Sequence, residues 1–412
     1  MENIKIISKS KYKFIEYLIY LQPILIVFSP LLSNLNLALI SIFGVYYILK
    51  YKPSYFIKNL YIKLFFIFWL LLIFSSVISE YKFHSLKSSF FYIKNLFFII
   101  AIYIIAINNK NFLKNFLKLF ISIYLFLIID AFIQIYFGFN IFGYELSKIE
   151  NGRVSGAFGK ELILGSYLTR NLFIVIGIYS LINKNSKFII FFILITSIIV
   201  LFTKERASFF LLVFGVMIYI IFSNNMSKKI KFFFTITFVG LLLLISLNIN
   251  HIYSRMFMDT KNNLLSNNKI IFFTEGHTKH FITAYKIYEQ NKIFGIGPNN
   301  FRKECEKDEY KIFDGCTTHP HNFYIQILAE VGIAGLIFII IFFITILTKL
   351  FKNINSQHHR HKEFQLCILI ALLINFWPIT TSGNFFGSSL SNIYILPFAF
   401  LMLFKKISLK RP

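Results

Sequence analysis

Histidines stand next to the start of a long apolar run in this 412-residue chain, in the stretch Thr318-His-Pro-His-Asn-Phe-Tyr-Ile-Gln-Ile-Leu-Ala-Glu-Val-Gly-Ile-Ala-Gly335. A neutral imidazole, with a pKa near about 6.5, can take a proton from a hydroxyl group at ambient pH. His321 is therefore a candidate general base, and His319 is the competing candidate. A capping or surface role is the alternative for a histidine at a helix start.

Arginines form a second set of side chains that could do chemistry. A guanidinium group stays charged and matches phosphate oxygens bidentately, so Arg206 is a candidate to bind a phosphorylated substrate. The alternative is a cation that extends from a membrane edge into water and pairs there with Glu205. Arg170 lies within an apolar run, where an unpaired charge costs at least about 2.5–3.5 kcal/mol. Arg170 therefore either faces a polar cavity or extends to the membrane surface.

Composition places these residues in a membrane protein. The chain is 57% hydrophobic and 15% charged, whereas soluble domains average about 45–50% apolar and about 25% charged residues. The net charge of +25 does not indicate nucleic-acid binding, because the lysines fall in short runs between apolar stretches. The first apolar stretch follows four lysines and has no cleavage motif, so we expect it to remain as a membrane span.

Twelve apolar stretches can cross a hydrocarbon core of about 30 Å. Loops and termini on the N-terminal side hold 24 Lys and Arg residues, and five short loops opposite hold seven. By the positive-inside rule, both termini lie in the cytoplasm. We predict an all-α, polytopic protein of the bacterial inner membrane, with about twelve transmembrane helices and its site facing the periplasm. The predicted spans are 14–32, 35–49, 64–79, 88–107, 119–137, 162–182, 188–203, 207–222, 232–248, 322–348, 364–381 and 390–404.

One periplasmic connection is long, which divides the chain into transmembrane helices over 1–248, a loop subdomain over 249–321 and further transmembrane helices over 322–412. The apolar spacing within 278–290 predicts an amphipathic helix lying on the membrane surface over a cavity open sideways to lipid. A second polar segment, 138–161, is rich in glycine and is expected to be irregular.

Two cysteines, Cys305 and Cys316, fall in the long loop. In an oxidising periplasm we expect a disulfide that closes a loop of about twelve residues and fixes the approach to His321. A metal site formed by these cysteines with His319 and His321 is the rival, although the spacing matches no usual zinc pattern.

Four separated motifs resemble the O-antigen ligase and polymerase family of bacterial envelopes, whose members share a periplasmic His-Asn followed by a Glu-x-Gly-x-x-Gly helix. The resemblance covers roughly 150–340 in order and topology, while the first five spans match only in hydropathy. Besides the stretch that contains His321, the matching segments are Gly152-Arg-Val-Ser-Gly-Ala-Phe-Gly159, Glu205-Arg-Ala-Ser208 and Phe294-Gly-Ile-Gly-Pro-Asn-Asn-Phe-Arg302.

The resemblance implies a glycosyltransferase of the GT-C type whose donor is a glycan on polyprenyl (undecaprenyl) diphosphate, with no metal or other cofactor. On the matching positions it makes His321 the catalytic base and Arg206 a diphosphate clamp. Without a metal ion, such cations would stabilise the charge that grows on the leaving diphosphate. The further substrate-binding candidates are Arg153, Arg170, His277, Arg302, Asn322 and Glu330.

One position departs from the family pattern. Members commonly have an arginine near the start of the helix before the Gly-x-Gly-Pro turn, where this chain has His277. A histidine binds diphosphate only when protonated, so either the phosphate raises its pKa or Arg255 or Arg302 supplies the charge. A solvated helix face is the alternative for His277 and His280.

Three functions remain open. An O-antigen ligase would move the glycan to a sugar hydroxyl of the lipid A-core, and a polymerase would move it to a second carrier-linked glycan. The His-Asn helix and the loop before it favour the ligase. A transporter of lipid-linked glycans should carry ionisable residues near the bilayer midplane in related positions of two halves, where only Asp130 and Lys94 are candidates. The expected partners are the lipid-linked donor, the lipid A-core and membrane lipids, and no nucleic acid.

Overall fold

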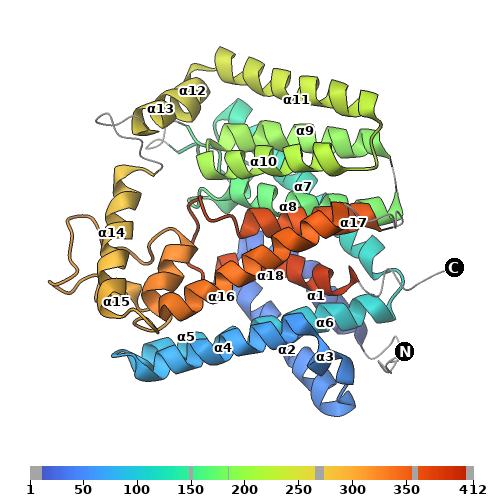
Figure 1. Ribbon diagram of the computed structural model, residues 1–412. Coiled ribbons are helices and arrows are strands. Elements are labelled where there is room, and N and C mark those ends of the chain that lie inside the picture. The colour runs from blue at the N-terminus through green and yellow to red at the C-terminus, as the bar shows by residue number, and fades with distance from the viewer. Residues whose placement is uncertain (1–11, 148–151, 184, 265–272, 355–360, 405–412) are drawn as a thin grey trace.

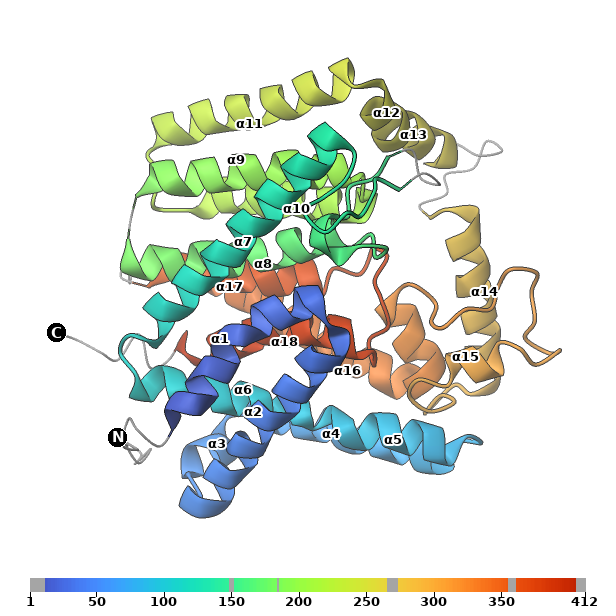
Figure 2. The same cartoon turned by 180° about the vertical axis from the view of Figure 1, so that it is seen from behind.

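The computed structural model describes residues 12–147, 152–183, 185–264, 273–354 and 361–404, which form a bundle of long helices with a smaller helical region across one end (Figures 1 and 2). The described residues contain no strand beyond two isolated β-bridges, which confirms the predicted all-α polytopic class. The bundle helices are α1 (Lys13–Phe28), α2 (Pro30–Tyr51), α3 (Ser54–Lys58), α4 (Leu60–Ile78), α5 (Lys82–Tyr92), α6 (Lys94–Asn108), α7 (Phe112–Phe137), α8 (Leu164–Ile182), α9 (Ser186–Thr203), α10 (Arg206–Phe222), α11 (Lys228–Asn248), α16 (Phe323–Ile354), α17 (Lys362–Asn375) and α18 (Ser388–Met402).

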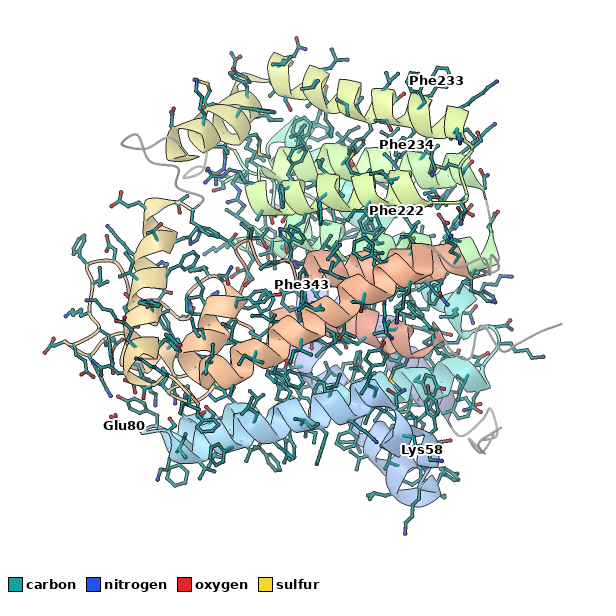
Figure 3. The ribbon with its side chains drawn as sticks, in the orientation of Figure 1. Lys58, Glu80, Phe222, Phe233, Phe234 and Phe343 are labelled. Carbon is teal, nitrogen blue, oxygen red and sulfur yellow. A yellow bond between two sulfur atoms is a disulfide. The ribbon has the colours of Figure 1, made fainter. Side chains whose placement is uncertain are left out.

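Helices occupy each of the twelve predicted spans. Eight helical stretches of the described chain are long and apolar enough to cross a membrane by themselves, and α1, α10, α17 and α18 are shorter. The number of spans therefore stays a prediction. The start of α1 and the end of α18 lie at one end of the bundle (Figure 2). Figure 3 labels Lys58 and Glu80 at opposite ends of the bundle, as alternating helix directions require.

The predicted span over 364–381 is wrong in its second half. Helix α17 ends at Asn375, and residues 376–387 continue without a helix before α18 begins at Ser388. Pro378 has no amide hydrogen, and it disfavours helical geometry in the residue before it. An apolar composition alone does not overcome this local restriction. We refer to residues 376–387 as the crossing segment.

Helix α16 is also interrupted, at Gly332, whose φ of 73° and ψ of −168° are not helical. Inside a membrane every backbone polar group needs a partner within the protein. The chain between α14 and α15 supplies the partners here. The amide of Ile333 donates to the carbonyl of Lys292 over 2.8 Å, and the amide of Gly297 donates to the carbonyl of Glu330 over 2.8 Å.

Glycine is required on both sides of this crossing. A Cβ atom on Gly332 would lie 2.3 Å from the carbonyl oxygen of Ile293, and one on Gly295 would lie 2.4 Å from the carbonyl carbon of Glu330. Both glycines also have positive φ. The Gly-x-Gly-Pro turn and the Glu-x-Gly motif are therefore two halves of one interlocked structure, which we call the glycine crossing.

The region between α11 and α16 forms a cap at one end of the bundle. Its longest helix, α14, runs crosswise to α16 and α4 (Figure 1), which confirms the predicted amphipathic helix. Serine side chains of α4 fasten the cap: Ser75 donates to the carbonyl of Phe294 over 2.7 Å, and Ser79 donates to that of Ile296 over 2.5 Å. The elements of the cap are α12 (Asn250–Tyr253), η3 (Ser254–Met258), α13 (Asp259–Leu264), α14 (Glu275–Gln290) and α15 (Phe301–Glu304).

The glycine-rich segment after α7 is irregular, as predicted, apart from one short helix, η2 (Gly156–Phe158). Buried polar side chains of α7 hold it. The Asp130 carboxylate accepts from the amide of Ile141 over 2.9 Å, and the Gln134 side chain accepts from the amide of Gly156 over 2.8 Å. Asp130 is thereby used in local structure at the end of α7.

Candidate functional site

Four imidazole rings meet where α14 approaches the start of α16. The ring centroid of His321 lies 4.3 Å from that of His319, 5.2 Å from that of His277 and 5.3 Å from that of His280. Helix α14 supplies His277 and His280, which are one helical turn apart on the same face. The segment before α16 supplies the other two rings. We call this group the histidine cluster, and His321 is the member that contacts all the others.

Backbone geometry aims His321 at the cluster. Its φ of 57° is left-handed, which is uncommon for a residue with a side chain. Its carbonyl accepts from the amide of Ser382 over 2.7 Å. The neighbouring Asn322 caps α16, because its side-chain oxygen accepts from the amide of Tyr324 over 3.0 Å, while its amide group donates to the carbonyl of Pro378 over 2.8 Å. Asn322 is buried and its polar side-chain atoms bond within the protein, while substrate contact by this residue stays a prediction.

Three histidines of the cluster, His277, His319 and His321, favour the neutral form. Burial, followed by the other three imidazoles, lowers the pKa of His321 to about 3. Burial is also the largest cause that lowers the pKa of His319 to about 4, and the pKa of His277 is lowered by burial, His280 and the charge of Arg206. A neutral imidazole can accept a proton, so each ring is in the state that a base requires.

Two ring nitrogens in the cluster have no partner among the described residues. Nδ1 of His277 and Nε2 of His319 are buried and make no hydrogen bond. Two further ring nitrogens do have partners. Nδ1 of His280 lies 3.1 Å from the carbonyl oxygen of Gly315, and Nδ1 of His319 lies 2.9 Å from the hydroxyl of Thr318. Buried polar atoms without partners are rare in folded proteins, and a ligand is one way to satisfy them.

Two arginines flank the histidine cluster from different elements. Arg206, the first residue of α10, lies near enough to His277 for its charge to lower the pKa of that ring. Arg302, in α15, acts in the same way on His319. Arg302 donates from Nη2 to the side-chain oxygen of Asn299 over 3.1 Å, while its buried Nε has no partner among the described residues. The structure therefore places each candidate cation near a ring that contacts His321.

Arg153 is drawn into the structure of the turn before α10. Its Nε donates to the carbonyl of Thr203 over 3.0 Å. Burial lowers the pKa of Lys204 to about 8, and the charges of Arg255 and Arg153 add to this effect. Arg255 donates to the carbonyl of Lys204 over 3.3 Å. Lys204 lies two residues before Arg206 in the chain. Together with Arg153 and Arg255 it adds positive potential next to the site.

Glu205 does not pair with Arg206. Its carboxylate accepts from the amides of Gly165 and Ser166 over 2.7 and 3.0 Å, so it caps the N-terminus of α8, where a negative charge complements the helix dipole. Ser208 donates to the same carboxylate over 2.8 Å. The partner that could have neutralised Arg206 is therefore committed elsewhere.

Arg170 lies in the interior of the bundle, since only 4% of it is exposed, and it does not extend to the membrane surface. Its guanidinium donates to Ser166 over 3.1 Å and to Asn375 over 2.9 Å, and it lies over the ring of Tyr394 at 4.9 Å. These partners are neutral, and its recorded contacts link α8 to α17 and α18 rather than to the histidine cluster.

Glu330 is buried in α16 and holds the chain that carries Arg302. Its two carboxylate oxygens accept from the amides of Asn299 and Phe301 over 2.8 and 2.9 Å, and Gln326 donates to it over 3.0 Å. Glu330 is thereby used to hold the chain that carries Arg302, and substrate contact by this residue stays a prediction.

Cys305 and Cys316 form the predicted disulfide, with their Cα atoms 5.2 Å apart. The bond leaves neither thiol free to act in the rival metal site. In the part of the chain that the structure describes, no group of three or more His, Cys, Asp or Glu residues has an arrangement that could hold a metal ion.

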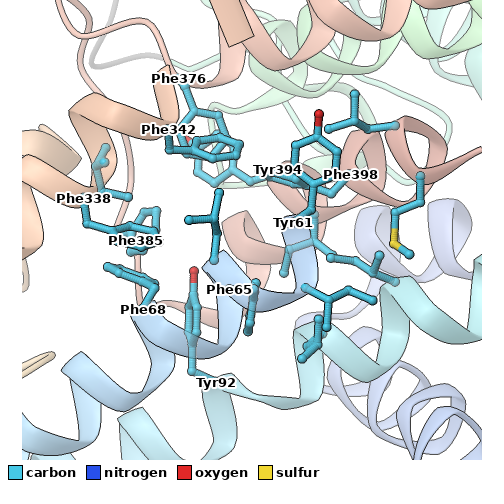
Figure 4. Close-up of a pocket in the computed structure, with 18 residues that line it drawn as sticks. Tyr61, Phe65, Phe68, Tyr92, Phe338, Phe342, Phe376, Phe385, Tyr394 and Phe398 are labelled. Carbon is cyan, nitrogen blue, oxygen red and sulfur yellow. The ribbon is translucent and has the colours of Figure 1, made fainter. Parts of the chain in front are cut away.

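An apolar cavity lies on the other side of the crossing segment, among α4, α6, α16 and α18 (Figure 4). It holds about 850 Å³, counted with its open mouth. Phe376 and Phe385 of the crossing segment line it, so one short segment borders both this cavity and the histidine cluster. Tyr394, which stacks with Arg170, forms part of the same wall.

Sequence reasoning missed three contributions to the site. His280 and His319 were noted only as alternatives, and nothing in their spacing indicated that they converge with His277 on His321. The crossing segment was assigned to a membrane span, so Ser382 was not considered. Pro378 was the signal that could have separated this segment from α17.

The family comparison covers the same elements. A model of the O-antigen ligase family matches residues 190–340, from α9 through the cap into α16. No curated protein sequence matches the chain. The matched region contains Arg206, the four histidines of the cluster, Arg302 and the glycine crossing. It includes three of the four motifs that carried the resemblance in the sequence, and the fourth, Gly152–Gly159, lies before it. Over residues 190–340 the chain is therefore similar to the O-antigen ligase family, in agreement with the resemblance that its motifs carry.

Proposed function

We propose that the protein is an O-antigen ligase that moves a glycan from polyprenyl diphosphate to a sugar hydroxyl of the lipid A-core at the periplasmic face of the inner membrane. The observation that carries the proposal is the histidine cluster, in which the half-buried ring of His321 lies 5.2 Å from the ring of His277 and 4.3 Å from the ring of His319. His277 and His319 link this ring to Arg206 and Arg302, respectively. A base beside an anion clamp is what glycosyl transfer from a diphosphate requires.

In the proposed step, His321 takes the proton of the acceptor hydroxyl. The acceptor oxygen then bonds to the anomeric carbon of the donor sugar, and the bond from that carbon to the diphosphate oxygen breaks. The proton ends on the imidazole, and the electron pair of the broken bond stays on the diphosphate. Arg206 and Arg302 stabilise the charge that develops there, which is the role that a metal ion has in other transferases.

His321 is a better candidate for the base than His319. Nδ1 of His319 lies 2.9 Å from the hydroxyl of Thr318, whereas His321 is the ring on which the other three converge. The pKa values of His321 and His319, about 3 and about 4, would be raised towards the operating pH by an anionic diphosphate beside these rings, which would strengthen them as bases.

The apolar cavity supports a lipid-linked donor. Its walls are aromatic and aliphatic side chains of four membrane helices (Figure 4), and a polyprenyl chain would remain in such an environment while its diphosphate reaches the site. A carrier without chemistry has less support, because Asp130 is used to hold the segment after α7.

The test is the lipopolysaccharide banding pattern of a strain that lacks the protein, complemented with wild type, His321→Ala or His361→Ala. His361 lies at the start of α17, at the far end of the bundle, and serves as the matched control. We expect deletion to leave core-lipid A without O-antigen while carrier-linked polymer accumulates. His321→Ala should lower transfer about 10²–10⁴-fold at an unchanged protein level, whereas the control restores it.

Two results would contradict the proposal. A core that carries a single repeat unit after deletion would identify a polymerase with the same donor. Normal transfer by an inserted His321→Ala protein would remove the catalytic role of this residue.

A further inference from the structure

The crossing segment contacts both the candidate base and a candidate cation. On one side, the amide of Ser382 donates to the carbonyl of His321 over 2.7 Å, and the hydroxyl of Ser382 accepts from the amide of Phe323 over 2.9 Å. These two bonds fix the left-handed backbone that aims His321 at the cluster. The base is thus tied to the crossing segment as well as to α16.

Two residues further along, Asn384 reaches towards Arg302. Its Nδ2 donates to the side-chain oxygen of Asn299 over 3.0 Å, and Nη2 of Arg302 donates to that same oxygen over 3.1 Å. Asn299 itself has a φ of 65°, a left-handed conformation that asparagine tolerates better than most residues. One amide oxygen therefore joins the crossing segment to the cation.

A side chain of α16 in turn holds Asn384. Gln326, which is fully buried, donates from Nε2 to Asn384 over 2.8 Å and to Glu330 over 3.0 Å, and its side-chain oxygen accepts from the amide of Phe385 over 2.9 Å. Glu330 accepts from the backbone amide of Asn299. The hydrogen bonds therefore close a ring of four residues, which are Asn384, Asn299, Glu330 and Gln326. Such fully satisfied polar networks hold their members in one arrangement.

We propose that Asn384 is a positioning residue which, together with Ser382 on the same segment, sets the distance between the proton acceptor His321 and the diphosphate-binding Arg302. The inference rests on the proposed function. Arg302 has several rotatable bonds, and its Nε has no partner among the described residues. Its bond to Asn299 orients the guanidinium, and the bond from Asn384 orients Asn299. Removing Asn384 would leave the charge of Arg302 in place but would loosen its position.

The test separates positioning from general stability by a double-mutant cycle on the full-length protein in proteoliposomes. Transfer from a polyprenyl-diphosphate-linked glycan to lipid A-core is measured for wild type, Asn384→Ala, Arg302→Ala and the double variant. Small misplacements in an active site can cost about 10²-fold in rate, so we expect Asn384→Ala to lower transfer roughly 10–100-fold. In the Arg302→Ala background the same change should lower transfer by less than about threefold, because residues that act through one another are not additive.

Asn392→Ala is the matched control. Asn392 is a buried asparagine of α18 that donates to Ser33 over 2.8 Å and has no hydrogen bond to the ring around Asn384 among the described residues. If Asn392→Ala lowers transfer, it should do so by the same factor in the wild-type and in the Arg302→Ala background. Binding of inorganic pyrophosphate to the same variants supplies a second readout, with the same pattern of coupling expected in the affinities.

Each outcome decides between the two levels of the proposal. If Asn384→Ala lowers transfer by the same factor in both backgrounds, it acts on the fold and the inference is overturned while the proposed function stands. If folded wild-type protein transfers no glycan, the proposed function fails and the inference fails with it. Coupling in both transfer and pyrophosphate affinity, together with an additive control, supports the inference.

Discussion

The two regions that meet at the site are built by different means. The histidine side consists of α14 and the chain around the glycine crossing, and backbone hydrogen bonds between distant segments hold it, such as that from Gly297 to Glu330. The cation side consists of the turn before α10, and side chains hold it, with Glu205 capping α8 and Arg153 bonded to the backbone at Thr203. His321 therefore stands beside crossing backbone segments, whereas Arg206 follows a turn that side chains hold.

This difference explains why some motifs of the sequence contain required glycines and another contains a required carboxylate. Gly295 and Gly332 are needed because two stretches of backbone cross at a distance that no side chain allows. Glu205 is needed because the amides at the start of α8 require an acceptor. Both motifs therefore encode architecture, and the residues that would meet the substrate stand beside them.

The largest effect on stability and transfer should come from a change in the glycine crossing. Gly332→Ala places a Cβ atom 2.3 Å from the carbonyl oxygen of Ile293 and imposes a backbone conformation that favours glycine alone. The conformational strain is worth about 1–3 kcal/mol before the clash is counted, and we expect a lower melting temperature and complete loss of transfer. Gly240→Ala is the control, since nothing lies within 4 Å of its Cβ position. A Gly332→Ala protein with normal melting and transfer would show that the glycine crossing does not position the cap.

Loss of the cations should come next. Arg206→Ala and Arg302→Ala each remove one charge from the diphosphate, and loss of one such group typically costs about 10²–10³ in rate. If both cations act on one diphosphate, the double variant should lose less than the product of the two single effects. Lys292→Ala, which removes an exposed cation of the cap, should leave transfer unchanged. Equal losses for Lys292 and the two arginines would indicate a general effect of charge instead.

The acid sensitivity of the fold should be smaller and should arise on the histidine side. The pKa values of His321 and His319, about 3 and about 4, lie below the ordinary value of about 6.5. Below about pH 6.5 the unfolded chain takes up protons that the folded chain does not, so stability is lost as the pH falls towards 4. The melting temperature of His319→Gln should therefore fall less than that of wild type between pH 7 and pH 4.5.

Inorganic pyrophosphate sharpens this measurement. An anion bound beside the rings favours their protonated form, so it should protect the wild type more strongly at pH 5 than at pH 8. An identical pH dependence for wild type and His319→Gln would mean that the cluster does not control acid sensitivity.

The sequence allowed the polytopic class, the twelve helical stretches, the amphipathic helix at α14, the disulfide and the family to be predicted, because each depends on local periodicity or on a motif that is contiguous in the chain. It did not reveal the histidine cluster. His277 and His321 are 44 positions apart in the sequence, and contacts between distant segments, such as the glycine crossing, bring them together.

The role of Glu330 shows the same limit. A carboxylate in an apolar helix suggests a functional group, yet its partners are backbone amides of Asn299 and Phe301, about thirty residues earlier in the chain. Backbone amides leave no trace in residue type. The crossing segment was missed for a different reason, because its apolar composition concealed the break that Pro378 imposes.

The disulfide should have the smallest effect on transfer of the changes considered. Cys305–Cys316 closes a short loop of the cap, and the loss of such a bond typically costs about 2–4 kcal/mol. The same region is also held by Ser75, Ser79 and the glycine crossing, which do not depend on the bond. We therefore expect the double variant Cys305→Ser and Cys316→Ser to melt at a lower temperature but to lose only a few-fold in transfer.

The comparison with Gly332→Ala decides which constraint dominates. Near the bond, His280 lies 3.1 Å from the carbonyl oxygen of Gly315, so removal of the disulfide should disturb His280 before it disturbs His321. His321 keeps its bond to Ser382 and its place at the cap of α16. If the cysteine variant instead loses as much transfer as Gly332→Ala, the covalent bond, rather than the crossing of two backbones, holds the base in position.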